Sequence, residues 1–388
     1  MLSILGRAAK LCDGISRRAF LQIAAIVVVS MTTRVAWADD AKPVKPVELP
    51  PLGQIMEGNR ANEPLAKEFS LKKSAEFLDN VAGAWTRQNQ CGACHTNFPY
   101  LQARPALLDK NTPAPVHDEI RKFFEDRVAN HWDKKETRAV VGRVPEVVAT
   151  AAYLAMNDAQ TTGKLHPLTR QALDRMWTLQ LKNGGWDWYY RPWSSLSWPP
   201  MLDTRSPGGH YYGATLAAVG VASASDHYAQ SDQAKAGLEK LRLYFKNNPP
   251  PSLHDKAMLF WAAQKLDGLM TQAEKGATIK ELFALQNEDG GWSLAGVGNY
   301  LIRHDGSAID RKVSDGYGTG YVIYILRQAN IPASDQRIQR GVAWLKTHQR
   351  ASGRWFTQSV NDYRNHAVTN TGTCYAVLAL KACGVDEK

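Results

Sequence analysis

Two cysteines and a histidine stand together in the segment Cys91-Gly92-Ala93-Cys94-His95. This Cys-x-x-Cys-His spacing is typical of c-type haem attachment, in which two thiols add to the two vinyl groups of the haem and the adjacent imidazole binds the iron. Three fixed residues of rare type within five positions make a chance match uncommon. The sequence therefore predicts one covalent haem c, held by Cys91 and Cys94, with His95 as an iron ligand.

Two other chemistries use paired cysteines. A thioredoxin-like disulfide needs a βαβ unit around the motif, and no such pattern surrounds this one. A four-ligand zinc site normally has a second closely spaced pair, whereas Cys374 and Cys383 lie nine residues apart on one apolar helical stretch. These two cysteines are expected to be small apolar side chains without a disulfide between them.

The first 38 residues resemble an export signal. Arg17 and Arg18 precede a short apolar run, and Ala36-Trp37-Ala38 has the small residues of a cleavage site. The paired arginines are similar to a twin-arginine signal, and the alternatives are the general secretory route and an uncleaved anchor. Because the apolar run is shorter than a membrane span requires, we expect a cleaved signal and a periplasmic protein.

The composition is that of an ordinary globular protein, with 388 residues of which 44% are hydrophobic and 22% charged. Such usage argues against disordered and fibrous classes. Residues 1–38 hold five basic and one acidic side chain, so their removal would lower the net charge from +10 to +6. Because the remaining charges are scattered along the chain, nucleic acid is not an expected partner.

The chain repeats itself after a proline-rich segment, residues 39–69, that is predicted to be an extended linker. The pattern Gln-x-x-x-Gly-x-Trp ends at Trp186, Trp292 and Trp355, each time after an apolar helical run and before a second apolar helix. Weaker helical segments fill the intervals without β-alternation. Residues 70–388 are therefore predicted to form about six helical hairpins, which bury by stacking the faces that one hairpin cannot.

These copies resemble the QW repeats of the squalene-hopene cyclase, oxidosqualene cyclase and protein prenyltransferase superfamily. The resemblance implies an all-α fold, an α/α toroid with inner and outer rings of helices around a central cavity. In the first repeat, Gln88, Gly92 and Cys94 stand where the other copies have Gln, Gly and Trp. The haem motif thus coincides with a repeat motif, and the haem is expected on the rim that carries the loops after the other copies.

Aromatic and polar residues after the motif copies are candidates for lining a pocket for an apolar or ring-shaped ligand, including the haem itself. These candidates are Trp188, Tyr189, His210, Tyr211, Tyr212, His304, Asp315 and Tyr317. Sealing of the core is the alternative role for the Trp and Tyr residues. The pair Ser314-Asp315 also fits the N-cap of a helix.

Terpene cyclase chemistry is not supported by the sequence. The resemblance implies an Asp-x-Asp-Asp cluster as the acid that protonates an alkene, and the chain contains neither this cluster nor an Asp-Asp-x-x-Asp run. Fold resemblance alone does not carry an activity.

The sequence thus predicts an exported c-type haem protein that transfers electrons or uses the haem to oxidise a hydrophobic ligand. Its partner would be a redox protein or a hydrophobic small molecule, and association with a membrane surface stays open. The second iron ligand also stays open, since a methionine, a histidine and an empty position each give different redox behaviour. The alternatives are a terpenoid cyclase-like or lyase-like toroid enzyme without a haem redox role, and a binding module without catalysis.

Overall fold

The computed structural model describes residues 59–108, 114–132, 143–188, 207–303, 306–360 and 366–387. Within these ranges the chain is helical, and its only β-type pairings are isolated bridges. No helix in the described ranges combines the length and apolar character needed to cross a membrane. The predicted export signal and the greater part of the predicted linker lie outside the described residues.

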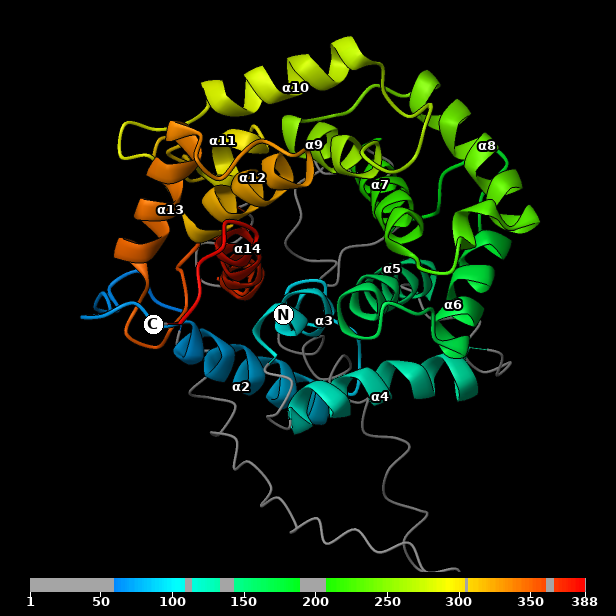
Figure 1. Ribbon diagram of the computed structural model, residues 1–388, viewed down its shortest axis with the longest axis horizontal. Helices are drawn as coiled ribbons and strands as arrows, with labels where there is room; N and C mark the ends of the chain where they lie inside the picture. The colour runs from blue at the N-terminus through cyan, green and yellow to red at the C-terminus, as the bar shows by residue number, and fades with distance from the viewer. Residues whose placement is uncertain are drawn as a thin grey trace, which may run out of the picture. The chain divides into compact units, whose positions relative to one another are not determined.

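The helices form two concentric rings (Figure 1). The outer ring consists of α2 (Leu71–Asn89), α4 (Pro115–Asn130), α6 (Pro167–Thr178), α8 (Asp232–Asn247), α10 (Gln272–Ala284) and α13 (Gln336–His348). The inner ring consists of α3 (Asn97–Ala103), α5 (Arg143–Thr161), α7 (Pro207–Ser223), α9 (Leu253–Ala262), α12 (Gly316–Gln328) and α14 (Val368–Ala382). Outer and inner helices alternate along the chain, and inner helices contact the outer helices that follow them, as α5 contacts α6 and α9 contacts α10. The predicted all-α toroid is therefore confirmed. The short elements η1 (Arg104–Leu107), η4 (Tyr228–Gln230) and α11 (Leu294–Val297) lie in connections.

Burial patterns explain the two rings. The outer helix α13 buries Ile338, Gly341, Trp344 and Leu345, which share one face, and its other positions are exposed apart from the half-buried Val342 and His348. The inner helix α12 is buried over residues 316–326, on every side, as expected of a helix enclosed by neighbours. Helix-to-helix contacts run from α3 through α5, α7, α9, α12 and α14 and return to α3, so the inner ring is closed.

Each tryptophan of the repeat motif anchors its loop in the same way. Trp186, Trp292 and Trp355 have no exposed surface, and each indole Nε1 donates to a backbone carbonyl ten residues earlier, at 2.7–2.9 Å. The motif glycines Gly184 and Gly290 have φ of 94° and 92°, a conformation that favours glycine. The motif therefore turns the chain after an outer helix and seals the turn with a buried indole.

Each glutamine of the motif links one hairpin to the next. The amide Nε2 of Gln180 donates to Gly184 O within its own motif and to Gly237 O on the next outer helix, both at 3.0 Å. Gln286 binds Gly290 and Arg337 in the same manner. The amide of Gln349 reaches the start of the first outer helix, α2, at Ser70 O (2.8 Å), and thereby ties the last repeat to the first.

The described part of the predicted linker pairs with the last repeat motif. Arg350 donates to Glu63 O at 2.7 Å, Ala351 N donates to Pro64 O at 2.9 Å, and Ala66 N donates to Gln349 O at 2.8 Å. Residues 63–66 therefore lie against this motif. The proline content predicts an extended chain. It does not predict this pairing, because the partner residues lie almost three hundred positions later in the sequence.

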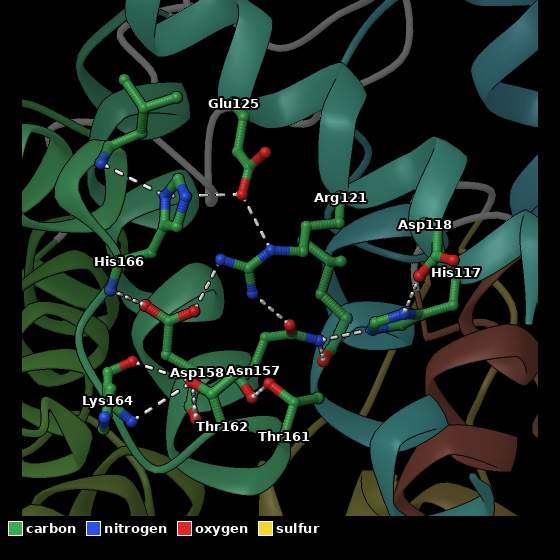
Figure 2. Close-up of polar contacts among 12 residues, drawn as sticks. His117, Asp118, Arg121, Glu125, Asn157, Asp158, Thr161, Thr162, Lys164 and His166 are labelled. Atoms are coloured by element: carbon green, nitrogen blue, oxygen red, sulfur yellow. Dashed lines mark hydrogen bonds and ion pairs between the residues drawn. The ribbon is translucent and has the colours of Figure 1, made fainter. Parts of the chain in front are cut away.

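A buried polar network joins α4, α5 and the start of α6 (Figure 2). The guanidinium of Arg121 donates to Glu125 at 2.8 Å and to Asn157 Oδ1 at 2.5 Å, and it pairs with Asp158 at 2.6 Å. Asp158 is 1% exposed and also accepts the backbone N–H of His166 at 2.8 Å. Because a buried carboxylate needs such partners, the network fixes how the second hairpin meets the third.

Candidate functional site

The Cys-x-x-Cys-His motif lies in the connection between α2 and α3. Asn97, the first residue of α3, holds this loop: its Oδ1 accepts from Ala93 N at 2.7 Å, and its Nδ2 donates to Cys91 O at 3.1 Å. The same amide donates to Thr86 Oγ1 on α2 at 3.0 Å. A single buried side chain thus fixes the loop against both helices.

Both thiols of the motif are partly exposed. His95 is exposed, yet its pKa is lowered because surrounding protein withdraws the imidazole from bulk water. The imidazole therefore keeps solvent-accessible surface although protein groups surround it. The described residues do not contain a cluster of three or more His, Cys, Asp or Glu side chains arranged to bind a metal ion.

The two thiols face different surroundings. Burial raises the pKa of Cys91, which lies close to the guanidinium of Arg127, itself paired with Glu146 at 2.6 Å. Cys94 instead interacts electrostatically with Tyr212 of α7 and Tyr153 of α5. The motif therefore lies between the ion pair that joins α4 to α5 and the tyrosines of the inner ring.

The first repeat departs from the other copies in structure as well as sequence. Gln88 is exposed, and Gly92 does not have the positive φ of the other motif glycines. A Cβ atom on Gly92 would lie 2.5 Å from the ring of Phe98, so a close contact with α3 requires glycine there. Cys94 follows the end of its outer helix, as Trp186 does. The thiol of Cys94 is partly exposed, whereas the indole of Trp186 is fully buried.

Two of the predicted pocket residues lie together at the inner ring. Trp188 and Tyr212 meet edge to face, with ring centroids 5.5 Å apart. Tyr317 belongs to the same region, because it interacts electrostatically with Tyr212. His210 is half-buried, with its Nδ1 at 2.8 Å from Trp186 O.

The other predicted pocket residues are placed elsewhere. Tyr211 is fully buried between α7 and α8, against Tyr244 and Phe245, and therefore seals the layer between the rings. Tyr189 and His304 lie outside the described residues.

Asp315 caps α12, as its sequence context predicted. Its carboxyl accepts from Gly318 N and Leu294 N, both at 2.8 Å. Burial raises the pKa of Asp315 to about 7, although both hydrogen bonds favour the ionised form. A share of this carboxyl is therefore protonated at neutral pH.

Sequence reasoning missed four residues near Tyr212 and Tyr317. They are Tyr153, His254, Tyr321 and Tyr375, which come from α5, α9, α12 and α14. The nitrogen Nε2 of His254 lies 2.9 Å from the Tyr317 hydroxyl, and the imidazole stacks on Tyr321 at 4.5 Å. Tyr321 was accessible to prediction, since it follows Tyr317 by one helical turn.

Comparison with known proteins agrees with this fold. Residues 301–388 match the family described as Squalene-hopene cyclase C-terminal domain. Sporulenol synthase of Bacillus subtilis (strain 168) is 32% identical over 124 residues, which make up 28% of this chain and 17% of the synthase. Squalene--hopene cyclase of Zymomonas mobilis subsp. mobilis (strain ATCC 31821 / ZM4 / CP4) is 29% identical over 121 residues, or 30% of this chain and 16% of the cyclase.

The chain therefore matches less than a fifth of the length of these curated relatives. The closed double ring of helices makes the described chain an α/α toroid, and part of the chain is similar to these cyclases. Among solved structures, Polysaccharide Lyase BACCELL_00875 aligns with a TM-score of 0.49 and 12% identity, over 80% of this chain and 96% of that chain.

Proposed function

We propose that this cyclase-like toroid carries a c-type haem, bound covalently by Cys91 and Cys94 with His95 as an iron ligand. The observation that carries the proposal is the arrangement of the motif: two partly exposed thiols precede an exposed imidazole in a loop fixed by Asn97. These residues fit the group, because thioether formation needs two reachable reduced thiols and iron binding needs a reachable imidazole nitrogen.

The chain's own residues would serve such a group in three ways. Asn97 fixes the backbone that carries both thiols, so their separation is set before attachment. The Arg127–Glu146 ion pair borders the Cys91 side, and the rings of Tyr212 and Tyr153 border the Cys94 side. When bound, the haem would supply one-electron redox chemistry or ligand binding at iron. The role is therefore redox, either electron transfer with a partner protein or oxidation of a hydrophobic small molecule.

The proposed role requires export. Residues 1–38 resemble a signal for transfer to the periplasm by the twin-arginine or the general secretory route, and haem c attachment belongs to that compartment. The mature protein is proposed to be periplasmic, with association to a membrane surface as an additional state.

Cysteine variants test the proposal. The wild-type protein, produced with the haem c maturation machinery, is expected to give a pyridine haemochrome spectrum of covalent haem. The double variant Cys91→Ser/Cys94→Ser is expected to lose the spectrum and keep its helical circular dichroism. Cys383→Ser, which removes a half-buried thiol elsewhere, is the matched control and should retain the haem. Covalent haem retained by the double variant would refute the assignment.

A second candidate function is a terpenoid cyclase-like or lyase-like enzyme without a haem redox role, and the two named relatives favour it. The matched segment contains Asp315, whose carboxyl is partly protonated at neutral pH. The absence of an Asp-x-Asp-Asp cluster from the sequence argues against this second candidate. A product formed from squalene by haem-free protein, lost in Asp315→Asn but kept in Asp310→Asn, would support this candidate. Asn also caps helices well, so the first variant removes the acid and preserves the cap.

A further inference from the structure

The side chains of Tyr317 and His254 form a hydrogen-bonded pair that the haem assignment does not use. The Nε2 atom of His254 lies 2.9 Å from the Tyr317 hydroxyl. The two residues come from α12 and α9, which contact each other in the inner ring. Tyr317 is 9% exposed and His254 is half-buried. A phenol and a basic nitrogen are thus held together within the protein, largely away from bulk water.

Both members of the pair are neutral at neutral pH. Burial raises the pKa of Tyr317, so the phenol keeps its proton. Burial lowers the pKa of His254 to about 4, so its ring carries one N–H group and leaves the other nitrogen as an acceptor. In the tautomer with the proton on Nδ1, Nε2 accepts from the Tyr317 hydroxyl. The phenol then has a base at hydrogen-bonding distance that can take up its proton.

Aromatic rings pack directly against the pair. His254 lies flat on Tyr321, with ring centroids 4.5 Å apart and an interplanar angle of 11°. The ring of Tyr375 meets both Tyr317 and Tyr321 edge-on at 5.1 Å. Because electron transfer becomes steeply slower with distance, rings in such contact exchange electrons more readily than separated rings. The pair therefore belongs to a contiguous group of oxidisable side chains.

The two phenols that contact His254 have different acceptors. The Tyr321 hydroxyl donates to the backbone oxygen of His254 at 2.7 Å. A carbonyl oxygen accepts a hydrogen bond but is too weak a base to take up a proton at neutral pH. The Tyr317 hydroxyl instead contacts an imidazole nitrogen, which is basic enough to do so. Loss of a proton is therefore easier for Tyr317 than for Tyr321.

The pair lies close to the Cys-x-x-Cys-His loop. The ring centroid of Tyr212 is 6.4 Å from that of His254, and Tyr212 also interacts electrostatically with Cys94. A single side chain thus connects the pair with the motif, where one-electron chemistry is proposed. An oxidising equivalent that arises at the loop would have the pair within reach.

We propose that Tyr317 is a redox-active tyrosine and that His254 is its proton acceptor. A one-electron oxidant, such as a high-potential transition-metal complex, removes one electron from the phenol, and the phenol proton moves to Nε2 of His254. The products are a neutral tyrosyl radical, an imidazolium and the oxidant reduced by one electron. Return of one electron and of the proton restores the pair.

This reaction suits a packed site. An oxidised phenol is a strong acid and must lose its proton, so the acceptor has to be in place beforehand. The hydrogen bond between Tyr317 and His254 provides this acceptor, and the reaction requires no further ligand. The inference goes beyond the haem assignment, because it involves neither the two motif cysteines nor His95.

Electron paramagnetic resonance after photo-oxidation tests the proposal on the full mature chain of Cys91→Ser/Cys94→Ser. This background removes two partly exposed thiols that would compete as electron donors, and it cannot hold a haem through thioether bonds. Photogenerated ruthenium(III) tris-bipyridine is the oxidant. The spectrum of the frozen sample is expected to show a neutral tyrosyl radical.

Two variants in this background identify the residues responsible. Tyr317→Phe keeps the ring and removes the phenol, so it should lose the greater part of the radical signal. His254→Gln keeps a hydrogen-bond acceptor but removes the base, and it should lose the signal likewise. A merely structural contact would tolerate the amide. His254→Gln also serves as the second variant if Tyr317→Phe does not fold, which circular dichroism shows.

Tyr211→Phe is the matched control. Tyr211 is a fully buried tyrosine whose hydroxyl has no hydrogen-bond partner among the described residues, so its phenol lacks a proton acceptor. This variant should keep the radical signal. The proposal would be overturned by a signal retained in folded Tyr317→Phe or His254→Gln, or by an equal loss in Tyr211→Phe.

The outcome is independent of the haem assignment, because the tested chain lacks both motif thiols. A tyrosyl signal that depends on Tyr317 and His254 would uphold the redox pair even if the wild-type chain carried no haem. The absence of any tyrosyl signal would overturn the redox pair and leave the haem assignment standing.

Discussion

At the scale of single residues, the repeat motif joins adjacent helices through close backbone contacts as well as through hydrogen bonds. Gly184 passes so near to the next outer helix that a Cβ atom there would lie 2.1 Å from Lys240 O. Because backbone atoms of a packed helix cannot move aside cheaply, this contact admits only glycine. The tight fit joins adjacent repeats at the same point as the amide of Gln180.

Gly184→Ala is therefore expected to lower the free energy of unfolding by about 3 kcal/mol, the sum of an unfavourable φ and an overpacked contact. Gly163→Ala is the control, since Gly163 also has positive φ (67°) but has open space around it. It should cost only about 1 kcal/mol. Urea denaturation of both variants measures the difference, and equal losses would show that the contact with Lys240 contributes nothing.

The residues of the candidate site were only partly predictable, for a physical reason. Outer helices have one apolar face, so their burial follows from spacing. Inner helices are apolar all round, so periodicity does not reveal which side faces the centre of the ring. Tyr211 and Tyr212 show the consequence, since they are adjacent in sequence and both were predicted as pocket residues. Tyr211 packs in the layer between the rings, whereas Tyr212 interacts with Cys94 and Tyr153.

At the scale of elements, the polar network of the second hairpin contains a titratable group in a fixed hydrogen-bonding role. Arg121 occupies the Oδ1 of Asn157, so the amide Nδ2 of Asn157 must donate, and one acceptor is Nε2 of His117 at 2.9 Å. An accepting nitrogen carries no proton. Burial lowers the pKa of His117 below its ordinary value of 6.5, in agreement with a neutral ring.

Stability is accordingly expected to fall on acidification. The folded chain holds His117 neutral, whereas the unfolded chain takes up a proton as the pH falls below about 6.5. Protonation therefore stabilises the unfolded state there, by at most about 1.4 kcal/mol per pH unit. The variant His117→Gln keeps an acceptor and does not titrate. Denaturation midpoints at pH 7.0 and pH 5.5 should differ less in the variant, and an identical dependence in both proteins would contradict this role.

Helices were predicted best where they are long. The apolar helical runs before the motifs of Trp186 and Trp355 were found from their spacing, and they correspond to α6 and α13. Helix α3 was missed, because seven residues directly after the cysteine motif are too few to show a period. Its inner-ring position depends on contacts with α5 and α14, which are distant in sequence.

At the scale of the whole molecule, one side chain contributes several of the hydrogen bonds that close the ring. Gln349 donates to Ser70 O and Ser74 Oγ, both at 2.8 Å, and its Oε1 accepts from Ser70 N at 2.8 Å. Its counterpart Gln286 makes two bonds, one of them to the neighbouring helix α13. The motif glutamine therefore makes more hydrogen bonds where the last repeat meets the first than where α10 meets α13.

Gln349→Leu should increase backbone hydrogen exchange at the start of α2 and in residues 59–66, because buried groups on both sides lose their partners. Gln286→Leu is the control and should increase exchange at the start of α13 while α2 keeps its wild-type rate. Backbone hydrogen exchange of both variants, measured by mass spectrometry, tests this prediction. Unchanged protection of α2 in Gln349→Leu would show that closure does not depend on this glutamine.

The central claim is that the accessible loop at Cys91–His95 carries a haem bound through two thioether bonds. The most direct measurement is the intact mass of the exported protein under denaturing conditions, after production with the haem c maturation machinery. The account predicts a mature chain heavier by one haem, with the addition located on a peptide that contains residues 91–95. A mass equal to that of the unmodified polypeptide would contradict it.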